Sequence, residues 1–203
     1  MKHLNNFIIE KLHINKDTKI DNYNYHPKDK NELKKIVKQI IDERGDNADM
    51  NDIDTSKITD MSYLFNLSKF NGDISKWNVS NVTDMSNMFY ESKFNGDISE
   101  WDVSKVKNME SMFERSYFNG DISNWDVSNV TDMRSMFQDS GFTGENEDIS
   151  NWDVSHVTDM NEMFNRSKFN GDISKWNVSN VKYMYNTFKK SPLEKNPPKW
   201  YKE

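Results

Sequence analysis

The sequence predicts an α/β repeat solenoid, in which short strands and helical turns stack behind an N-terminal helical cap. One motif recurs at a period of 24 residues, lengthened once to 27, and the copies begin at Phe70, Phe94, Phe118, Phe142 and Phe169. A fixed period in this range is typical of stacked repeats. A unit this short cannot bury its own apolar face, so neighbouring units must share one core.

The N-terminal segment, residues 1–28, is expected to be a docking or targeting arm. Leu4, Phe7, Ile8 and Leu12 are spaced i, i+3, i+4, i+8, which places them on one face of a short helix. A helix this short is marginal in water, so the arm should order only against another surface. That surface is either a partner protein or the helix that follows, and both alternatives stay open. The polar face is not strongly basic, which disfavours a membrane-surface helix.

Residues 29–52 are expected to form a capping helix and a lead-in. Asp29 and Glu32 have capping-box spacing, and Gly45 stands where a helix of about residues 30–44 would end. The apolar stripe of this helix consists of Leu33, Ile36, Val37, Ile40 and Ile41. This stripe should cover the apolar end of the first repeat.

The repeats themselves span residues 53–191. Residues 54–65 align with residues 78–89, so the stack begins with a half-unit. In the first full unit, residues 74–79 are expected to form a strand, residues 82–85 a second strand or extended turn, and residues 86–91 a helical turn. Parallel stacking would repeat equivalent positions about every 4.8 Å.

Two aromatic columns should run through this stack, with methionines filling the space between the rings. The tryptophan column consists of Trp77, Trp101, Trp125, Trp152, Trp176 and Trp200. The phenylalanine column consists of Phe89, Phe113, Phe137, Phe164 and Phe188. Residues 192–203 are expected to be a C-terminal cap, because Trp200 follows Trp176 by one period and Pro197 and Pro198 remove backbone donors there.

Composition excludes several classes of protein. The chain has no cysteine, so disulfide frameworks and thiolate metal sites are excluded. Its net charge of −6 is modest and mixed, which does not suggest a nucleic-acid partner. No apolar run is long enough to enter a membrane, and the first residues lack a signal-peptide core. A cytoplasmic location is therefore expected.

The motif F-N-x-D-I-S-x-W-x-V-S-x-V-T-x-M-x-x-M-F resembles the BspA-like leucine-rich-repeat family, whose repeats are typical of mycoplasmal lipoproteins and bacterial surface proteins. The resemblance runs from Thr55 to about Lys190. It implies a right-handed, leucine-rich-repeat-like stack and a binding or adhesion role. The segment NNFIIEKLHINKDTK also resembles a leader found on bacteriophage proteins. That resemblance implies a phage-encoded protein with a shared docking tag.

Repeated carboxylates are the first candidate site. Stacked aspartates could bind calcium between units, but each is flanked by asparagine or serine, which favours hydrogen bonding within its own turn. The row consists of Asp73, Asp97, Asp121, Asp148 and Asp172. No single constellation differs from the rest as a catalytic site would. We therefore expect no enzyme activity, no cofactor and no metal.

Positions that differ between copies are the second candidate. Constant residues build the spine, so variable ones can encode a partner, although neutral drift on a solvated face is the alternative. The partner-binding candidates are Tyr90, Tyr117, Arg134, Glu145, Glu147 and Tyr185. The two glutamates lie in the lengthened fourth copy, and loops on rigid scaffolds often carry function.

The expected function is therefore non-catalytic protein binding. Partner proteins would contact the solenoid face and the N-terminal arm. The leading interpretation is an intracellular adaptor, phage-encoded and virion-associated, in the host cytoplasm or the virion. The alternative is a cell-surface adhesion module whose export signal is missing or unconventional.

Overall fold

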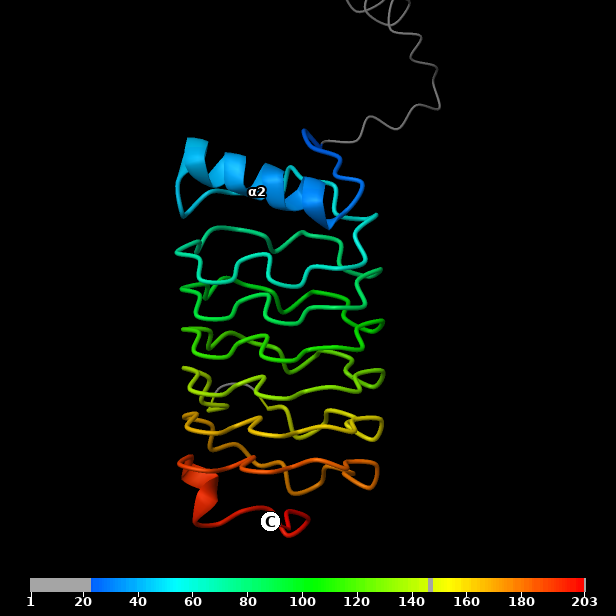
Figure 1. The fold of residues 1–203 in the computed structure, drawn as a ribbon, viewed down its shortest axis with the longest axis vertical. Coiled ribbons are helices and arrows are strands. Elements are labelled where there is room, and N and C mark those ends of the chain that lie inside the picture. Colours follow the sequence, from blue (N-terminus) through cyan, green and yellow to red (C-terminus); the bar gives the residue numbers. More distant parts are fainter. Residues whose placement is uncertain (1–22, 146–147, 203) are drawn as a thin grey trace, which may run out of the picture.

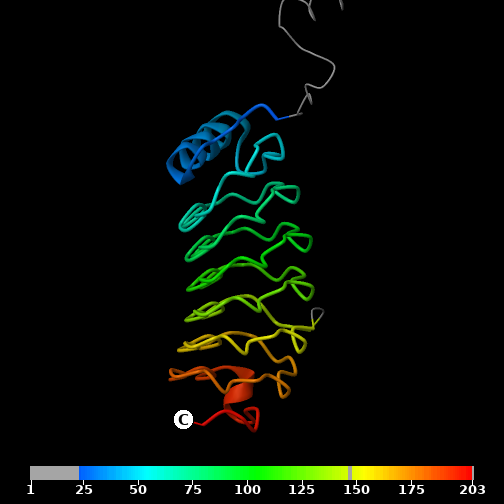
Figure 2. The same ribbon diagram turned by 90° about the vertical axis from the view of Figure 1, so that its right-hand side faces the viewer.

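The computed structural model describes residues 23–145 and 148–202. The chain winds into a stack of similar coils, with helix α2 lying across one end (Figure 1). Figure 2 shows the same stack from the side, each coil lying beneath the previous one. Residues 1–22 of the predicted docking arm, with Leu4, Phe7, Ile8 and Leu12, lie outside the described residues, and so does Glu147. The rest of the predicted arm, residues 23–28, is described, and its Asn24 and Tyr25 N–H groups donate to the carbonyl of Asp52 at 2.8 Å and 3.2 Å.

Helix α2 spans Lys30–Arg44, which confirms the helix predicted for about residues 30–44. The Asp29 side chain accepts the backbone N–H groups of Asn31 and Glu32, and Gly45 ends the helix with a φ of 85°. Its buried residues are Leu33, Val37 and Ile40, while Ile36 and Ile41 are partly buried against the same core. The other helix of the described chain is the short 3-10 helix η1, Pro192–Glu194.

The predicted α/β class was wrong. In the described part of the chain there is no β-strand, and α2 and η1 are the only helices. Contacts of β type occur only as isolated parallel bridges, such as Asp60 with Asp84 and Asp84 with Asn108. Residues 74–79, predicted as a strand, and residues 82–85, predicted as a second strand or extended turn, are turns and irregular chain, and Asp84 is the one residue among them that makes these bridges. The coils are therefore built of loops, not of strands and helical turns.

Side chains that bond to their own backbone explain why strands do not form. In the first full coil, Ser68, Asp73, Asn78 and Asp84 each accept the backbone N–H of the residue two positions later. The same bends recur at equivalent positions in the next coils. Such local bonds offer the backbone an alternative to a strand ladder. The chain therefore turns every five to eight residues, which is too often for a strand to extend.

The predicted helical turn at residues 86–91 was also wrong. Asn87 and Glu91 have φ values of 56° and 51°, in the left-handed region that an α-helix excludes. The chain instead makes linked turns, in which the N–H of Met88 donates to Met85 and that of Tyr90 to Asn87. The same pair of positions is left-handed in the other coils: Tyr63 and Leu67, Ser111 and Arg115, Ser135 and Asp139, Glu162 and Arg166, Asn186 and Lys190.

Neighbouring coils are joined by a ladder of backbone hydrogen bonds along these linked turns. Alternate N–H groups of one coil donate to carbonyl groups of the next, at 2.7–3.0 Å. The coils of Phe137 and Phe164 are joined in this way. The backbone N–H groups of the first coil donate in turn to the carbonyl groups of the second, and the pairs are Met133 with Asp159, Ser135 with Asn161, Phe137 with Met163 and Asp139 with Asn165. The three additional residues of the fourth copy thus leave this ladder unbroken.

Both predicted aromatic columns are present. Successive rings of the phenylalanine column, which begins at Phe65, lie 5.6–5.9 Å apart and nearly parallel. Each of the six column tryptophans donates its indole N–H to a backbone carbonyl of the preceding coil at 2.8–3.2 Å. Trp200 takes part in this pattern through the carbonyl of Ile173, as the cap prediction requires.

Replacing Leu67 by asparagine is expected to stabilise the protein. Leu67 is 64% exposed and has a φ of 56°, a conformation that costs most residues about 1–2 kcal/mol but that asparagine tolerates. We expect the free energy of unfolding to rise by about 0.5–1 kcal/mol, measured by urea denaturation. Leu67→Ala is the control, because it removes the leucine and keeps the backbone cost; an equal gain from alanine would contradict the explanation.

Candidate binding surface

The outward side chains of the linked turns form one continuous surface, which we term the ladder face. It comprises residues 60–67 and the equivalent segments 84–91, 108–115, 132–139, 159–166 and 183–190. Most of their buried apolar residues are the methionines and phenylalanines of the core, which recur with little change. The exposed positions change from coil to coil: the residue two positions after each column phenylalanine is Leu67, Glu91, Arg115, Asp139, Arg166 and Lys190 in turn, and of these only Asp139 is partly buried.

Three of the predicted partner-binding residues lie on the ladder face. They are Tyr90, Arg134 and Tyr185, and Tyr185 is 66% exposed. Tyr117 lies just beyond the third segment, 64% exposed, with the Lys93 ammonium 5.0 Å from its ring. The structure thus brings these four residues to one side of the molecule.

Glu145 lies elsewhere. It lines a shallow hollow together with Asp148, Asp172 and Lys175, which belong to the segments that lead to the column tryptophans. The structure therefore does not unite Glu145 with the tyrosines in one site.

Arg134 is already engaged within the protein. Its guanidinium lies 2.9 Å from carboxylate oxygens of Glu110 and Asp132 and 3.7 Å from Asp159. Hydrogen bonding to Asp132 raises the pKa of Arg134 above its ordinary value. Burial raises the pKa of Asp159, and the nearby Asp132 carboxylate adds to this effect. Arg134 thus neutralises a cluster of acids and is not free to act as an isolated basic contact.

Tyr90 is tied to the neighbouring coil. The Arg115 guanidinium donates to the Tyr90 hydroxyl at 3.2 Å and to the Glu91 carboxylate at 2.7 Å. Burial raises the pKa of Tyr90, and the pKa of Glu91 is lowered by its bond to Arg115. Beside them, burial raises the pKa of Glu114, which accepts the Ser111 hydroxyl at 2.8 Å. The middle of the ladder face is therefore a network of satisfied polar groups.

The last coil differs from the others. Its segment from Lys182 to Lys190 reads KYMYNTFKK and contains no acidic residue. Tyr183 stands where most coils place aspartate, and it is 58% exposed beside the exposed Tyr185. Lys182, Lys189 and Lys190 are exposed as well. Basic and aromatic side chains thus gather at this end of the ladder face.

The backbone of the last coil is also unusual. Its carbonyl groups accept the ladder bonds of the preceding coil, as in the rest of the stack. Its outward N–H groups, which would donate to a further coil, find no backbone acceptor among the described residues. They belong to Met184, Asn186, Phe188 and Lys190. Sequence reasoning had pointed to Tyr185 here and missed Tyr183, although its replacement of the aspartate was a readable signal.

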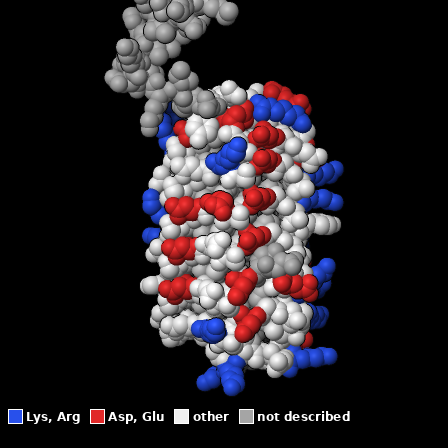
Figure 3. All heavy atoms as spheres, turned by 180° about the vertical axis from the view of Figure 1, so that it is seen from behind, with Lys and Arg blue, Asp and Glu red and all other residues white. Residues whose placement is uncertain are grey.

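Acidic side chains form columns along the stack on the side that faces away from the viewer in Figure 1 (Figure 3). The aspartates considered for calcium are exposed, and each accepts the N–H of a serine two residues on: Asp73, Asp97, Asp121, Asp148 and Asp172. Backbone hydrogen bonding lowers the pKa of Asp73, Asp97 and Asp172. The predicted turn role is therefore confirmed. Within the described ranges, no three histidine, cysteine or acidic residues form a group that could hold a metal ion.

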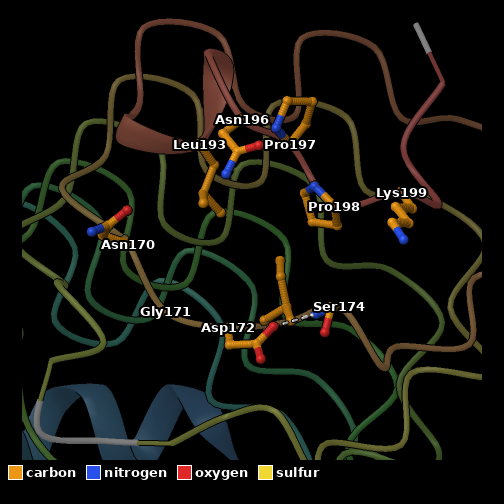
Figure 4. Close-up of a pocket in the computed structure, with 10 residues that line it drawn as sticks. Asn170, Gly171, Asp172, Ser174, Leu193, Asn196, Pro197, Pro198 and Lys199 are labelled. Atoms are coloured by element: carbon orange, nitrogen blue, oxygen red, sulfur yellow. Dashed lines mark hydrogen bonds between the residues drawn. The ribbon is translucent and has the colours of Figure 1, made fainter.

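A hollow of about 670 Å³ lies at the C-terminal end of the described chain. Figure 4 shows Leu193, Asn196, Pro197 and Pro198 on one side and Asp172 and Ser174 on the other. Pro197 stands one period after Ile173 and is smaller, so the cap fills this end less completely than a full coil would.

These features define the molecule as a repeat protein of stacked loop coils with a variable outer face. A family model described as "Mycoplasma protein of unknown function, DUF285" matches residues 31–145 and 116–201, and the chain belongs to this family. The match does not bear on the resemblance to the BspA-like family, which stays a prediction. No curated protein matches the chain, and no solved structure does. None of the described helices is long and apolar enough to cross a bilayer.

Proposed function

We propose that this chain is a non-catalytic protein-binding module whose ladder face selects the partner. The supporting observation is that one backbone framework presents different side chains at equivalent exposed positions, while the core beneath them hardly changes. A rigid framework holds its surface side chains without a large ordering cost on binding. As the leading interpretation, the partner lies in the cytoplasm of the producing cell or in a virion.

The last coil is the proposed centre of this surface. Tyr183 and Tyr185 are exposed, two residues apart, and tyrosine is enriched among residues that dominate binding energy. In the middle of the face, Arg115 and Arg134 already bond to acidic neighbours. The lysines of the last coil have no acidic side chain in their own segment. Complementary charge speeds association and excludes wrong partners, so this surface favours an acidic partner.

Paired tyrosine variants test the proposal. Full-length protein, Tyr185→Ala and Tyr63→Ala would each be used to capture partners from lysate of the source cell, followed by titration of any captured protein. Tyr63 is the matched control, since it is 50% exposed at the opposite end of the ladder face. We expect Tyr185→Ala to weaken binding at least tenfold, about 1.4 kcal/mol, and Tyr63→Ala to change it little.

The outcomes separate the alternatives. Equal binding by both variants would reject the last coil as the centre. Loss of binding in a Phe7→Asp variant alone would assign the partner to the N-terminal arm. If only extracellular or surface proteins were captured, the adhesion interpretation would replace the adaptor.

A further inference from the structure

Four asparagine–glycine pairs occur in this chain, and all share the local sequence Phe-Asn-Gly-Asp-Ile-Ser. The asparagines are Asn71, Asn95, Asn119 and Asn170. An asparagine before glycine is prone to spontaneous loss of its side-chain amide, because glycine has no Cβ to hinder attack by its backbone nitrogen. With identical neighbours, the four sites should react at one rate in the unfolded chain. Any difference in the folded protein must then come from its structure.

The stack holds three of these side chains in place. The Oδ1 atom of Asn71 accepts the backbone N–H of Asn95 at 2.7 Å, and that of Asn95 accepts the N–H of Asn119 at 2.8 Å. Asn119 in turn accepts the N–H of Thr143 at 2.8 Å and its hydroxyl at 3.3 Å. Each amide is thus an acceptor for the coil that follows, and moving it breaks a bond between coils.

Asn170 lacks this restraint. No described residue donates a hydrogen bond to its Oδ1 atom. The residue one period later is Glu194, which lies in η1 and donates its backbone N–H to Ser191 at 3.2 Å. In Figure 4 the Asn170 amide lies at the edge of the terminal hollow and makes no bond to the other residues drawn. The 3-10 helix has therefore replaced the coil that would have held this side chain.

Solvent access does not distinguish Asn170 from Asn71 and Asn95. Asn71, Asn95 and Asn170 are all exposed, and Asn119 is half-buried. The glycine N–H groups that would attack make no backbone hydrogen bond at any of the four sites within the described chain. What distinguishes Asn170 is the missing bond from a following coil.

We propose that Asn170 is the site of spontaneous deamidation in the folded protein. The backbone nitrogen of Gly171 attacks Cγ of Asn170, forming an N–Cγ bond, while the Cγ–Nδ2 bond breaks. The Gly171 amide proton passes through solvent to the departing amide nitrogen, and ammonia leaves. Solvent water then opens the cyclic imide at one of its two carbonyl carbons, leaving aspartate or isoaspartate at position 170.

The product changes the C-terminal end of the molecule. A new carboxylate appears two residues from Asp172, on the rim of the terminal hollow. Net charge changes from −6 to −7. Isoaspartate also lengthens the main chain by one carbon. The added carbon lies beside a backbone contact between coils, in which the Asn170 N–H donates to the carbonyl of Thr143 at 3.0 Å. Reaction at Asn170 therefore changes the charge and the backbone of one end of the stack slowly and irreversibly.

Mass spectrometry of aged protein tests this assignment. Trypsin is unsuitable, because residues 70–76 and 169–175 give the same peptide, FNGDISK. Cleavage after glutamate separates all four sites, placing Asn95 in residues 92–100 and Asn170 in residues 163–194. Folded full-length protein would be incubated at mildly alkaline pH, and the mass gain of about 1 Da followed at each site. A parallel sample in concentrated urea supplies the unfolded reference.

We expect Asn170 in the folded protein to react at least fivefold faster than Asn71 or Asn95, the factor that corresponds to one hydrogen bond of about 1 kcal/mol. In urea the four rates should be equal. Equal rates in the folded protein, or a faster reaction at Asn71, would overturn the proposal. Asn170→Gln should abolish most of the acidic isoform that accumulates on ion exchange, whereas Asn71→Gln should not.

Discussion

Replacing Phe113 by alanine is expected to lower the free energy of unfolding by about 3–5 kcal/mol, as large-to-small changes of buried phenylalanine do. Phe113 is fully buried in the middle of the stack. Its ring lies 5.6 Å from Phe89, 5.8 Å from Phe137 and 4.2 Å from Phe118. Alanine would leave a cavity that touches three coils, and the ladder hydrogen bonds keep those coils from collapsing into it. Urea denaturation followed by tryptophan fluorescence measures the loss.

Two further variants keep this test informative. Gln138→Ala changes a partly exposed residue of the neighbouring coil and should alter stability by less than about 0.5 kcal/mol. If Phe113→Ala does not fold, Phe113→Leu should still fold and lose about 1–1.5 kcal/mol. A loss below about 1 kcal/mol for the alanine variant would show that the phenylalanine column does not carry the stability of the stack.

The core and the cap could be predicted from sequence because they depend on side-chain identity alone. Phenylalanines and tryptophans at a fixed period must stack if the units stack, and the spacing of Leu33, Val37 and Ile40 suffices to define α2. The strands could not be excluded in the same way. Short apolar runs such as residues 74–79 fit a strand equally well until their flanking Asp73 and Asn78 are seen to bend the chain. That competition between side chain and backbone decides the fold class here.

The candidate surface was predicted only in part, for a related reason. Variation between copies identified Tyr90, Arg134 and Tyr185, which do lie on one face. Variation alone does not reveal that a left-handed backbone limits what can be substituted at some variable positions, such as Glu91 and Arg115. Nor does a pattern show which side chains are already bonded, as Arg134 is to Glu110 and Asp132. The unpaired N–H row of the last coil depends on how the stack is terminated, which no repeat pattern describes.

Gly72 lies against the lead-in that joins α2 to the first coil, and we expect this position to tolerate no side chain. A methyl group there would lie 2.0 Å from the carbonyl oxygen of Ala48 and 2.8 Å from its nitrogen, and backbone atoms cannot turn aside. Three bonds hold these segments together: Asn71 to Asp46 at 2.7 Å, Asp73 to Ala48 at 3.1 Å and Met50 to Asp73 at 2.9 Å. We expect Gly72→Ala to cost about 3 kcal/mol, the upper part of the range for overpacking.

Gly120→Ala is the matched control for Gly72→Ala, because both glycines lie in the sequence Phe-Asn-Gly-Asp-Ile-Ser and differ only in what surrounds them. At Gly120 the nearest atoms belong to the Phe118 ring, at 2.9 Å and 3.0 Å, and the nearest backbone atom is 3.6 Å away. A ring can shift where a carbonyl cannot, so the loss should be smaller. Hydrogen exchange should then show α2 opening in the Gly72 variant and staying protected in the Gly120 variant. Equal losses would mean that the ring contact, and not the backbone of the lead-in, requires glycine at this position of the coil.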